Sequence, residues 1–289
     1  MSDDWFDAAA HELILRRVLL AMRVPPALLA FGPPRWRAFV SRLAHWRSVR
    51  RRTTAEEWRR STRGVPVLLY HAFGEEPSRF VIPLRTFARQ LRLLALLGYR
   101  VVPYGELAMA LRSGSRTAVL TIDDGYADNG ADAAAVLERR GFGATVFVVS
   151  GRLGADNDWS DVPPLRGRPM LAAEDLRRLR GRGLEFGAHT RTHPALPDLG
   201  DDELAEEIES SRSELERTLG EPVRSFAYPY GRFDERAVAA VRRAGFASAC
   251  TTEPRPARVD DDPLLIPRIE IKRSDSLPRF LLKVWFGGR

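Results

Sequence analysis

The chain has 289 residues, with 45 Lys and Arg against 38 Asp and Glu, and a single cysteine. This length suffices for one large α/β domain with an appendage, and one cysteine excludes an intramolecular disulfide. Residues 1–63 hold 13 Arg against 6 acidic residues, whereas the rest of the chain is balanced at 32 against 32. A nucleic-acid-binding protein would spread basic charge over its folded domain, so we expect no nucleic-acid partner.

Residues 1–63 form a basic first unit, which we expect to be an N-terminal helical appendage that ends in a linker. Its acidic start lacks the positive region of a signal peptide. Arg residues and the Pro25-Pro26 pair interrupt its longest apolar stretch, which excludes a simple transmembrane helix. Apolar residues at helical spacing with Arg between them are typical of an interfacial membrane anchor. A helix packed on a domain or a partner has the same pattern, so both interpretations stay open.

From residue 64 the pattern changes to alternating helices and strands. Glycine commonly ends a helix, and four predicted helices end at a glycine followed by an apolar run, at Gly98, Gly141, Gly183 and Gly245. Strands are predicted to begin near Val65, Arg100, Ala118, Ala144, Leu184, Ser225, Phe246 and Leu264. Seven or eight parallel strands with helices between them favour an α/β barrel. We place this domain at residues 64–275, followed by a C-terminal tail at 276–289.

The helices predicted between these strands cover residues 85–97, 126–139, 172–180, 201–219 and 234–243. In the helix 201–219, Asp201 and Asp202 suit the amino-terminal end, and Gly220 suits the stop. Four glutamates of this helix are interpreted as its solvated face: Glu203, Glu206, Glu207 and Glu209.

The apolar run 118–122 stops at two adjacent carboxylates, Asp123 and Asp124, followed by Gly125. Such a run predicts a buried strand, and acids at its carboxyl end would lie where α/β folds place their active sites. Neighbouring side chains of a strand point to opposite sides, so the two acids share a site only if the chain turns, which Gly125 permits. A plain turn with a helix cap is the alternative.

Two of the five histidines, His189 and His193, lie four residues apart after another apolar run. Two histidines and one carboxylate can hold zinc and leave a position open for water or substrate. A zincin helix is excluded because Thr190 follows the first histidine in place of Glu, and Pro194 favours a loop. Two ordinary surface histidines are the alternative, but a metal site of Asp124, His189 and His193 explains both stretches.

The segments 121–125 (Thr-Ile-Asp-Asp-Gly) and 189–194 (His-Thr-Arg-Thr-His-Pro) together resemble the first two motifs of the NodB-homology polysaccharide deacetylases, carbohydrate esterase family 4. The resemblance runs from Val65 to Ile271 and includes Tyr70-His71 and the late segment 228–231 (Tyr-Pro-Tyr-Gly). It implies a distorted (β/α) barrel. The implied activity is that of a metal-dependent hydrolase that cleaves the carbon–nitrogen bond of an N-acetylated amino sugar.

The resemblance also implies roles for single residues. Asp123 would be the general base, Asp124, His189 and His193 would hold the metal, and the backbone N–H of Tyr230 would assist at the oxyanion. Zn²⁺ suits these ligands, and Co²⁺, Ni²⁺ or Fe²⁺ would fit as well. The residues expected to contact substrate are His71, Trp159, Tyr228 and Pro229.

Two of these expectations have alternatives. Trp159 lies in the long polar loop 151–169, and loops of this kind often contact substrate. We expect its ring either to stack on a sugar or to cover an edge of the core. His71 ends the first strand, where it faces the mouth of the site or serves as a satisfied structural histidine.

Two positions depart from the family pattern. The arginine that normally orients the base is replaced by Ala227, and no histidine follows His193, although the last family motif usually supplies a histidine as general acid. The matching late stretch offers Arg268 and Glu270 instead, and resembles the branch that acts on poly-N-acetylglucosamine. The proton donor is thus unassigned: Asp123 serves in both steps, or the chain is a non-catalytic glycan-binding relative.

The implied partner is an N-acetylated glycan, as a polysaccharide, an oligosaccharide or a lipid-linked precursor. Most glycan deacetylases of this type act outside the cytoplasmic membrane, but no export signal is readable in this sequence. We therefore expect a cytoplasmic protein, peripheral at the inner membrane face if residues 1–63 contact the membrane.

Overall fold

The computed structural model describes residues 64–113 and 115–288. The predicted appendage at residues 1–63, with its membrane contact, lies outside these residues. Among the described residues, no helix combines the length and the apolar character needed to cross a membrane.

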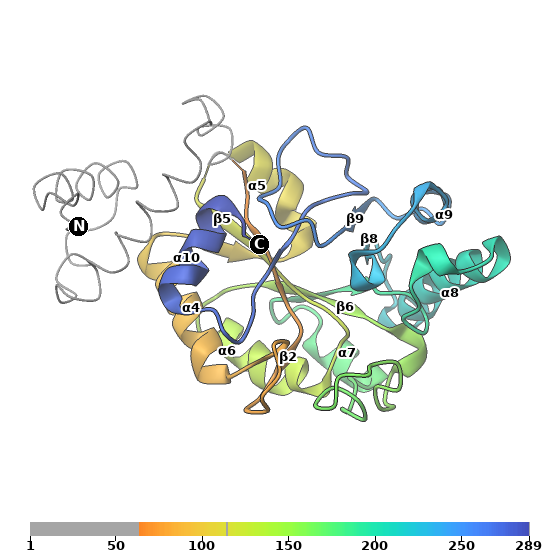
Figure 1. Cartoon of the computed structure of the whole chain (residues 1–289), viewed down its shortest axis with the longest axis horizontal. Coiled ribbons are helices and arrows are strands. Elements are labelled where there is room, and N and C mark those ends of the chain that lie inside the picture. Colours follow the sequence, from red (N-terminus) through yellow and green to blue (C-terminus); the bar gives the residue numbers. More distant parts are fainter. Residues whose placement is uncertain (1–63, 114, 289) are drawn as a thin grey trace, which may run out of the picture. The chain divides into compact units, whose positions relative to one another are not determined.

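Eight strands pair in parallel in one curled sheet. Seven of them follow the spatial order β10-β1-β5-β6-β7-β8-β9. The eighth, β4, pairs with the first half of β5, whereas β6 pairs with the end of β5. Helices surround this sheet (Figure 1). The architecture is the predicted distorted (β/α) barrel. The strands are β1 (Val67–Tyr70), β4 (Arg100–Val102), β5 (Thr117–Ile122), β6 (Ala144–Val148), β7 (Leu184–Ala188), β8 (Ser225–Ala227), β9 (Ser248–Cys250) and β10 (Ile269–Glu270). Two further short strands, β2 (Ala72–Phe73) and β3 (Val81–Ile82), pair with each other.

The long helices follow the prediction closely, and the four glycines predicted to end helices all have positive φ. The helices are α4 (Leu84–Leu96), α5 (Leu107–Ser113), α6 (Ala134–Glu138), α7 (Ala173–Leu179), α8 (Asp201–Leu219), α9 (Glu235–Arg243) and α10 (Leu277–Phe286). The helix predicted at 126–139 is different, because its first half is a π-helix, Asn129–Ala133. The buried Asn129 amide donates to His71 O (2.9 Å), which ties this segment to the end of β1.

One late segment of the chain closes the barrel by contacting both edges of the sheet. Ile266 pairs with β9, donating to Ala249 O (2.9 Å) and accepting from Thr251 N (2.8 Å). Three residues later, β10 lies parallel to β1. The strand predicted to begin near Leu264 is therefore β10, which begins at Ile269, after a single bridge from Ile266 to β9.

The barrel interior is a packed hydrophobic core. Residues from several strands form one buried cluster, which includes Val67, Val102, Tyr104, Val119, Phe147, Ala227, Cys250 and Ile266. Cys250 is buried, as its apolar surroundings in the sequence predict. Burial raises the pKa of its thiol to about 12, so it stays protonated at neutral pH.

The segment 276–289, expected as a tail, contains α10, which packs into the domain. Phe280 is fully buried. The Lys283 ammonium donates to Glu270 O (2.7 Å) and to Asp275 Oδ2 (2.6 Å), which joins the helix to the end of β10. The helix therefore belongs to the barrel, and the boundary after residue 275 divides a single packed unit.

We predict that Phe280→Ala lowers the free energy of unfolding by about 3–5 kcal/mol, because a fully buried ring is removed. Leu277→Ala in the same helix changes it by about 0.5 kcal/mol or less, because Leu277 is exposed. Urea unfolding of both variants measures the difference. Equal small losses would show that α10 does not contribute to the core.

Candidate active site

The predicted site residues meet at the carboxyl ends of the strands. Asp123 and Asp124 follow β5, and His189 and His193 follow β7. They line one cavity of about 630 Å³, together with His71, Trp159 and Tyr230. Segments far apart in the sequence thus supply one site, where α/β barrels place their chemistry.

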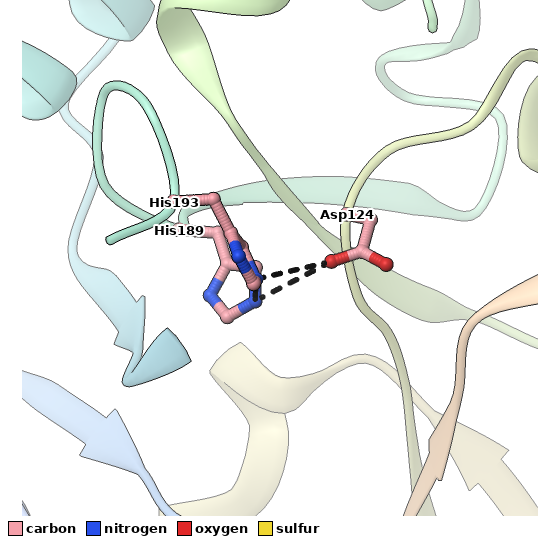
Figure 2. A group of neighbouring side chains, drawn as sticks. All are labelled: Asp124, His189 and His193. Atoms are coloured by element: carbon pink, nitrogen blue, oxygen red, sulfur yellow. Dashed lines mark hydrogen bonds and ion pairs between the residues drawn. The ribbon is translucent and has the colours of Figure 1, made fainter. Parts of the chain in front are cut away.

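Asp124, His189 and His193 converge on one point (Figure 2). Asp124 Oδ1 lies 3.4 Å from His193 Nε2 and 3.7 Å from His189 Nε2. The two Nε2 atoms are 3.2 Å apart. All three side chains are buried, and their three donor atoms lie within 4.8 Å of one another.

The chemistry of these donors fits a divalent cation. His189 Nδ1 lies 2.7 Å from Ala227 O, which can only accept, so Nδ1 carries the proton and Nε2 presents a lone pair. Burial lowers the pKa of His193 well below its ordinary value, so the His193 ring is neutral. Burial also raises the pKa of Asp124, which a bound cation would reverse. Two imidazoles and a carboxylate are a common zinc ligand set.

An unusual backbone conformation marks the site. Among the described residues, four non-glycine residues have positive φ: Asp124 (73°), Thr190 (62°), His193 (69°) and Tyr230 (59°). The chain therefore already turns at Asp124, one residue before the predicted Gly125, and this turn brings both carboxylates into one cavity. Such conformations cost about 1–3 kcal/mol each and persist only where surrounding contacts enforce them.

Asp123 is held by a buried arginine. Arg268 is fully buried and donates from Nη1 and Nη2 to the two oxygens of Asp123, at 2.6 and 2.7 Å. Its remaining donors reach Thr251 O (2.9 Å) and Thr121 Oγ1 (3.2 Å). Burial alone would raise the pKa of Asp123, but Arg268 opposes this and the pKa falls to about 2.

Arg268 thus orients Asp123, although Ala227 stands where the family pattern has its arginine. The sequence shows Arg268 as one of two charged residues, with Glu270, in the otherwise apolar stretch 264–271. That signal indicates a buried and therefore paired charge, but not its partner.

His71 faces the same cavity. Its ring packs edge-on against Phe80, with centroids 4.9 Å apart. Its Nδ1 is buried and has no hydrogen-bond partner among the described residues. His71 acts electrostatically on Asp124 and on Glu270, which also line the cavity. It is therefore placed at the site and keeps an unused hydrogen-bonding nitrogen.

Two aromatic side chains flank His193. The Trp159 ring stacks on it at 5.0 Å between centroids, and the Tyr230 ring contacts it edge-on at 4.6 Å. Tyr230 is 55% exposed, so it presents a free face. Tyr228 and Pro229, predicted to contact substrate, are buried and do not line the cavity. The Tyr228 ring packs on Phe226 and Phe233 instead.

The prediction that Glu207 lies on the solvated face of α8 is wrong. Its Oε2 accepts from Arg191 N (2.9 Å) and Thr192 N (2.8 Å), in the loop between the two histidines. Glu209 is exposed, as predicted. Helical periodicity identifies a polar face but does not show which loop packs on it.

A carboxylate–histidine–histidine set beside an arginine-held aspartate, at the carboxyl end of a (β/α) barrel, is typical of a metal-assisted hydrolase. The family model named polysaccharide deacetylase matches residues 111–249. The match covers just under half of the chain, so polysaccharide deacetylases are the family that this chain resembles.

Three proteins illustrate what this chain is similar to. YxkH of Bacillus subtilis (strain 168), named for polysaccharide deacetylation, is 25% identical over 72% of this chain and 71% of its own. The poly-beta-1,6-N-acetyl-D-glucosamine N-deacetylase of Staphylococcus aureus is 23% identical over 53% of this chain. The aligned region covers 52% of that enzyme, about half of its length. The structure of IcaB from Ammonifex degensii superposes with a TM-score of 0.67 at 26% identity, covering 78% of this chain and 97% of that one.

We predict that Arg268→Met destabilises the fold by about 3–5 kcal/mol at pH 7, because it leaves Asp123 as an unpaired buried charge. The pKa of Asp123, about 2, lies below its unfolded value. The stabilisation is therefore complete above about pH 5 and is lost as the pH falls through the unfolded value near 3.9 toward 2.

Urea unfolding of the wild type and the variant between pH 7 and pH 3 tests this prediction. Arg79→Met is a suitable control, because its ion pair with Glu270 is largely exposed on the arginine side and contributes about 1 kcal/mol or less. The difference between wild type and Arg268→Met should narrow at low pH. A difference that stays constant with pH would contradict the role of the ion pair.

Proposed function

We propose that this protein is a metal-dependent N-deacetylase that acts on an N-acetylated amino sugar within a glycan. The observation that carries the proposal is the position of Asp123. It is ionised and fixed by Arg268 directly beside the donor set of Asp124, His189 and His193. The names of the Staphylococcus aureus relative and of the YxkH protein support a glycan as the substrate.

Asp123 is suited to accept a proton from the attacking water. The side-chain donors of Asp124, His189 and His193 would hold a divalent metal. Bound there, the metal supplies a Lewis acid that raises the acidity of water and polarises the acetyl carbonyl. The low pKa of Asp123 keeps this carboxylate ionised at neutral pH, which is the form that a general base requires. The Tyr230 N–H is the proposed additional donor to the developing oxyanion.

His71 is the proposed proton donor to the leaving amine. The His71 side chain lines the cavity that contains Asp123, and its buried Nδ1 has no hydrogen-bond partner within the described part of the chain. A late histidine is absent from the sequence, but His71 reaches the site from the first strand. This assignment replaces the alternative in which Asp123 serves in both steps.

The aromatic side chains offer a surface for the sugar. Trp159 and Tyr230 lie on either side of the His193 ring, and a cavity of about 630 Å³ accommodates a sugar unit with its acetamide. An apolar sugar face packs well on such rings. The acetyl group would then point toward the donor set.

Acetate release from N-acetylglucosamine oligomers tests the proposal directly. We expect release that a chelator abolishes and that Zn²⁺ or Co²⁺ restores. Asp123→Asn should lower kcat by about 10²–10⁴-fold, because the amide cannot accept the proton. Stoichiometric metal binding without acetate release from any glycan tested would instead favour a non-catalytic glycan-binding protein.

A second test separates the two possible proton donors. His71→Gln should lower kcat by about 10²–10³-fold, because a glutamine side chain cannot act as a general acid toward the leaving amine. KM should change little. An unchanged kcat would return both proton transfers to Asp123.

A further inference from the structure

We propose that Glu207 on α8 is a positioning residue for the metal site. Its carboxylate fixes the backbone of the loop 190–192, which joins the two histidine donors. This inference rests on the proposed function, because it takes His189 and His193 as metal ligands. It assigns a specific role to a side chain outside the cavity.

The loop needs an external acceptor. Thr190 and His193 both have positive φ, a conformation that local contacts only partly stabilise. Thr190 Oγ1 donates to His189 O (2.6 Å) and accepts from His193 N (2.9 Å). These two bonds leave the N–H groups of Arg191 and Thr192 without an acceptor inside the loop.

Glu207 supplies that acceptor. One oxygen, Oε2, accepts from Arg191 N at 2.9 Å and from Thr192 N at 2.8 Å. The other, Oε1, accepts from Thr192 Oγ1 at 2.5 Å. Successive N–H groups in a tight turn form an anion-binding concavity, and bonds to an ionised acceptor are stronger than neutral ones. The carboxylate therefore satisfies three donors of the loop at once.

The opposite side of the loop is fixed by the segment that follows β6. Ser150 N donates to Thr190 O (3.2 Å), and Gly151 N donates to Arg191 O (2.9 Å). A Cβ at residue 151 would lie 2.7 Å from Arg191 O, so only glycine allows this approach. The loop is thus held between the end of β6 and α8.

A second glutamate strengthens this arrangement. Glu214 is two helical turns after Glu207, on the same face of α8. It accepts from Ser150 Oγ (2.6 Å) and from Arg191 Nε (2.9 Å). The Arg191 side chain is partly exposed, so we assign the main effect on the loop to Glu207, which binds the backbone.

Loss of Glu207 is expected to weaken metal affinity more than it slows the chemical step. The two Nε2 atoms approach within 3.2 Å only because the loop turns back on itself. Without Glu207, the backbone at residues 190–193 can relax toward ordinary helical or extended angles, which moves the ring of His193 away from that of His189. Groups that orient metal ligands typically change metal affinity or activity by about 10–100-fold.

The test uses the full-length protein and Zn²⁺ alone, without substrate. Glu207→Ala should weaken Zn²⁺ affinity by about 10–100-fold, measured by competition with a chelating dye. Amide hydrogen exchange at Arg191 and Thr192 should become faster, while amides in β5 and β6 keep their protection. Glu207→Gln should lie between Ala and wild type, because its side-chain oxygen still accepts but carries no charge. Glu209→Ala, an exposed acid on the same helix, should match wild type.

The outcomes separate this inference from the proposed function. A wild type that binds no Zn²⁺ would overturn the metal site and, with it, this role. Wild-type Zn²⁺ affinity in Glu207→Ala, with unchanged exchange at the two loop amides, would overturn the role of Glu207 alone. If Glu207→Ala fails to fold, Glu207→Gln and Glu207→Asp provide the same comparison. Recovery of kcat in the variants at saturating Zn²⁺ supports an effect on affinity.

Discussion

The buried ion pair between Arg268 and Asp123 is the interaction on which the site depends. Removing either charge from water is costly, so the pair is tolerated only because both carboxylate oxygens and the remaining guanidinium donors find partners. The arginine also donates to Thr121 in β5 and to Thr251, which directly follows β9. The requirement to satisfy one arginine therefore constrains how the sheet closes, and the closed sheet in turn fixes Asp123.

Backbone strain is concentrated where donor atoms must converge. Asp124, His193 and Tyr230 adopt left-handed angles that give their side chains or N–H groups directions unavailable to a regular strand. The cost is met by contacts outside the cavity, such as the carboxylate of Glu207 on the loop amides. The fold itself therefore fixes the arrangement of the three side chains proposed as metal ligands.

The order of elements could be read from the sequence because helix-ending glycines and apolar runs are local signals. Asp124 and His193 were predictable for the same reason, since each lies near the end of a buried strand. The sequence offered Arg268 without a role and placed Glu207 on a solvated helix face. Their roles could not be predicted, because they depend on contacts between segments that are distant in the sequence. Tyr228 was placed in the cavity in error, because its side chain is fully buried and packs on Phe226 and Phe233.

The late position of Arg268 has a consequence for biosynthesis. Its partner precedes it by 145 residues, so most of the barrel leaves the ribosome before the charge on Asp123 can be neutralised. Until then, β1 has an open edge where β10 will pair, and the acidic end of β5 stays hydrated. Closure of the sheet and fixation of Asp123 by Arg268 are thus coupled during folding.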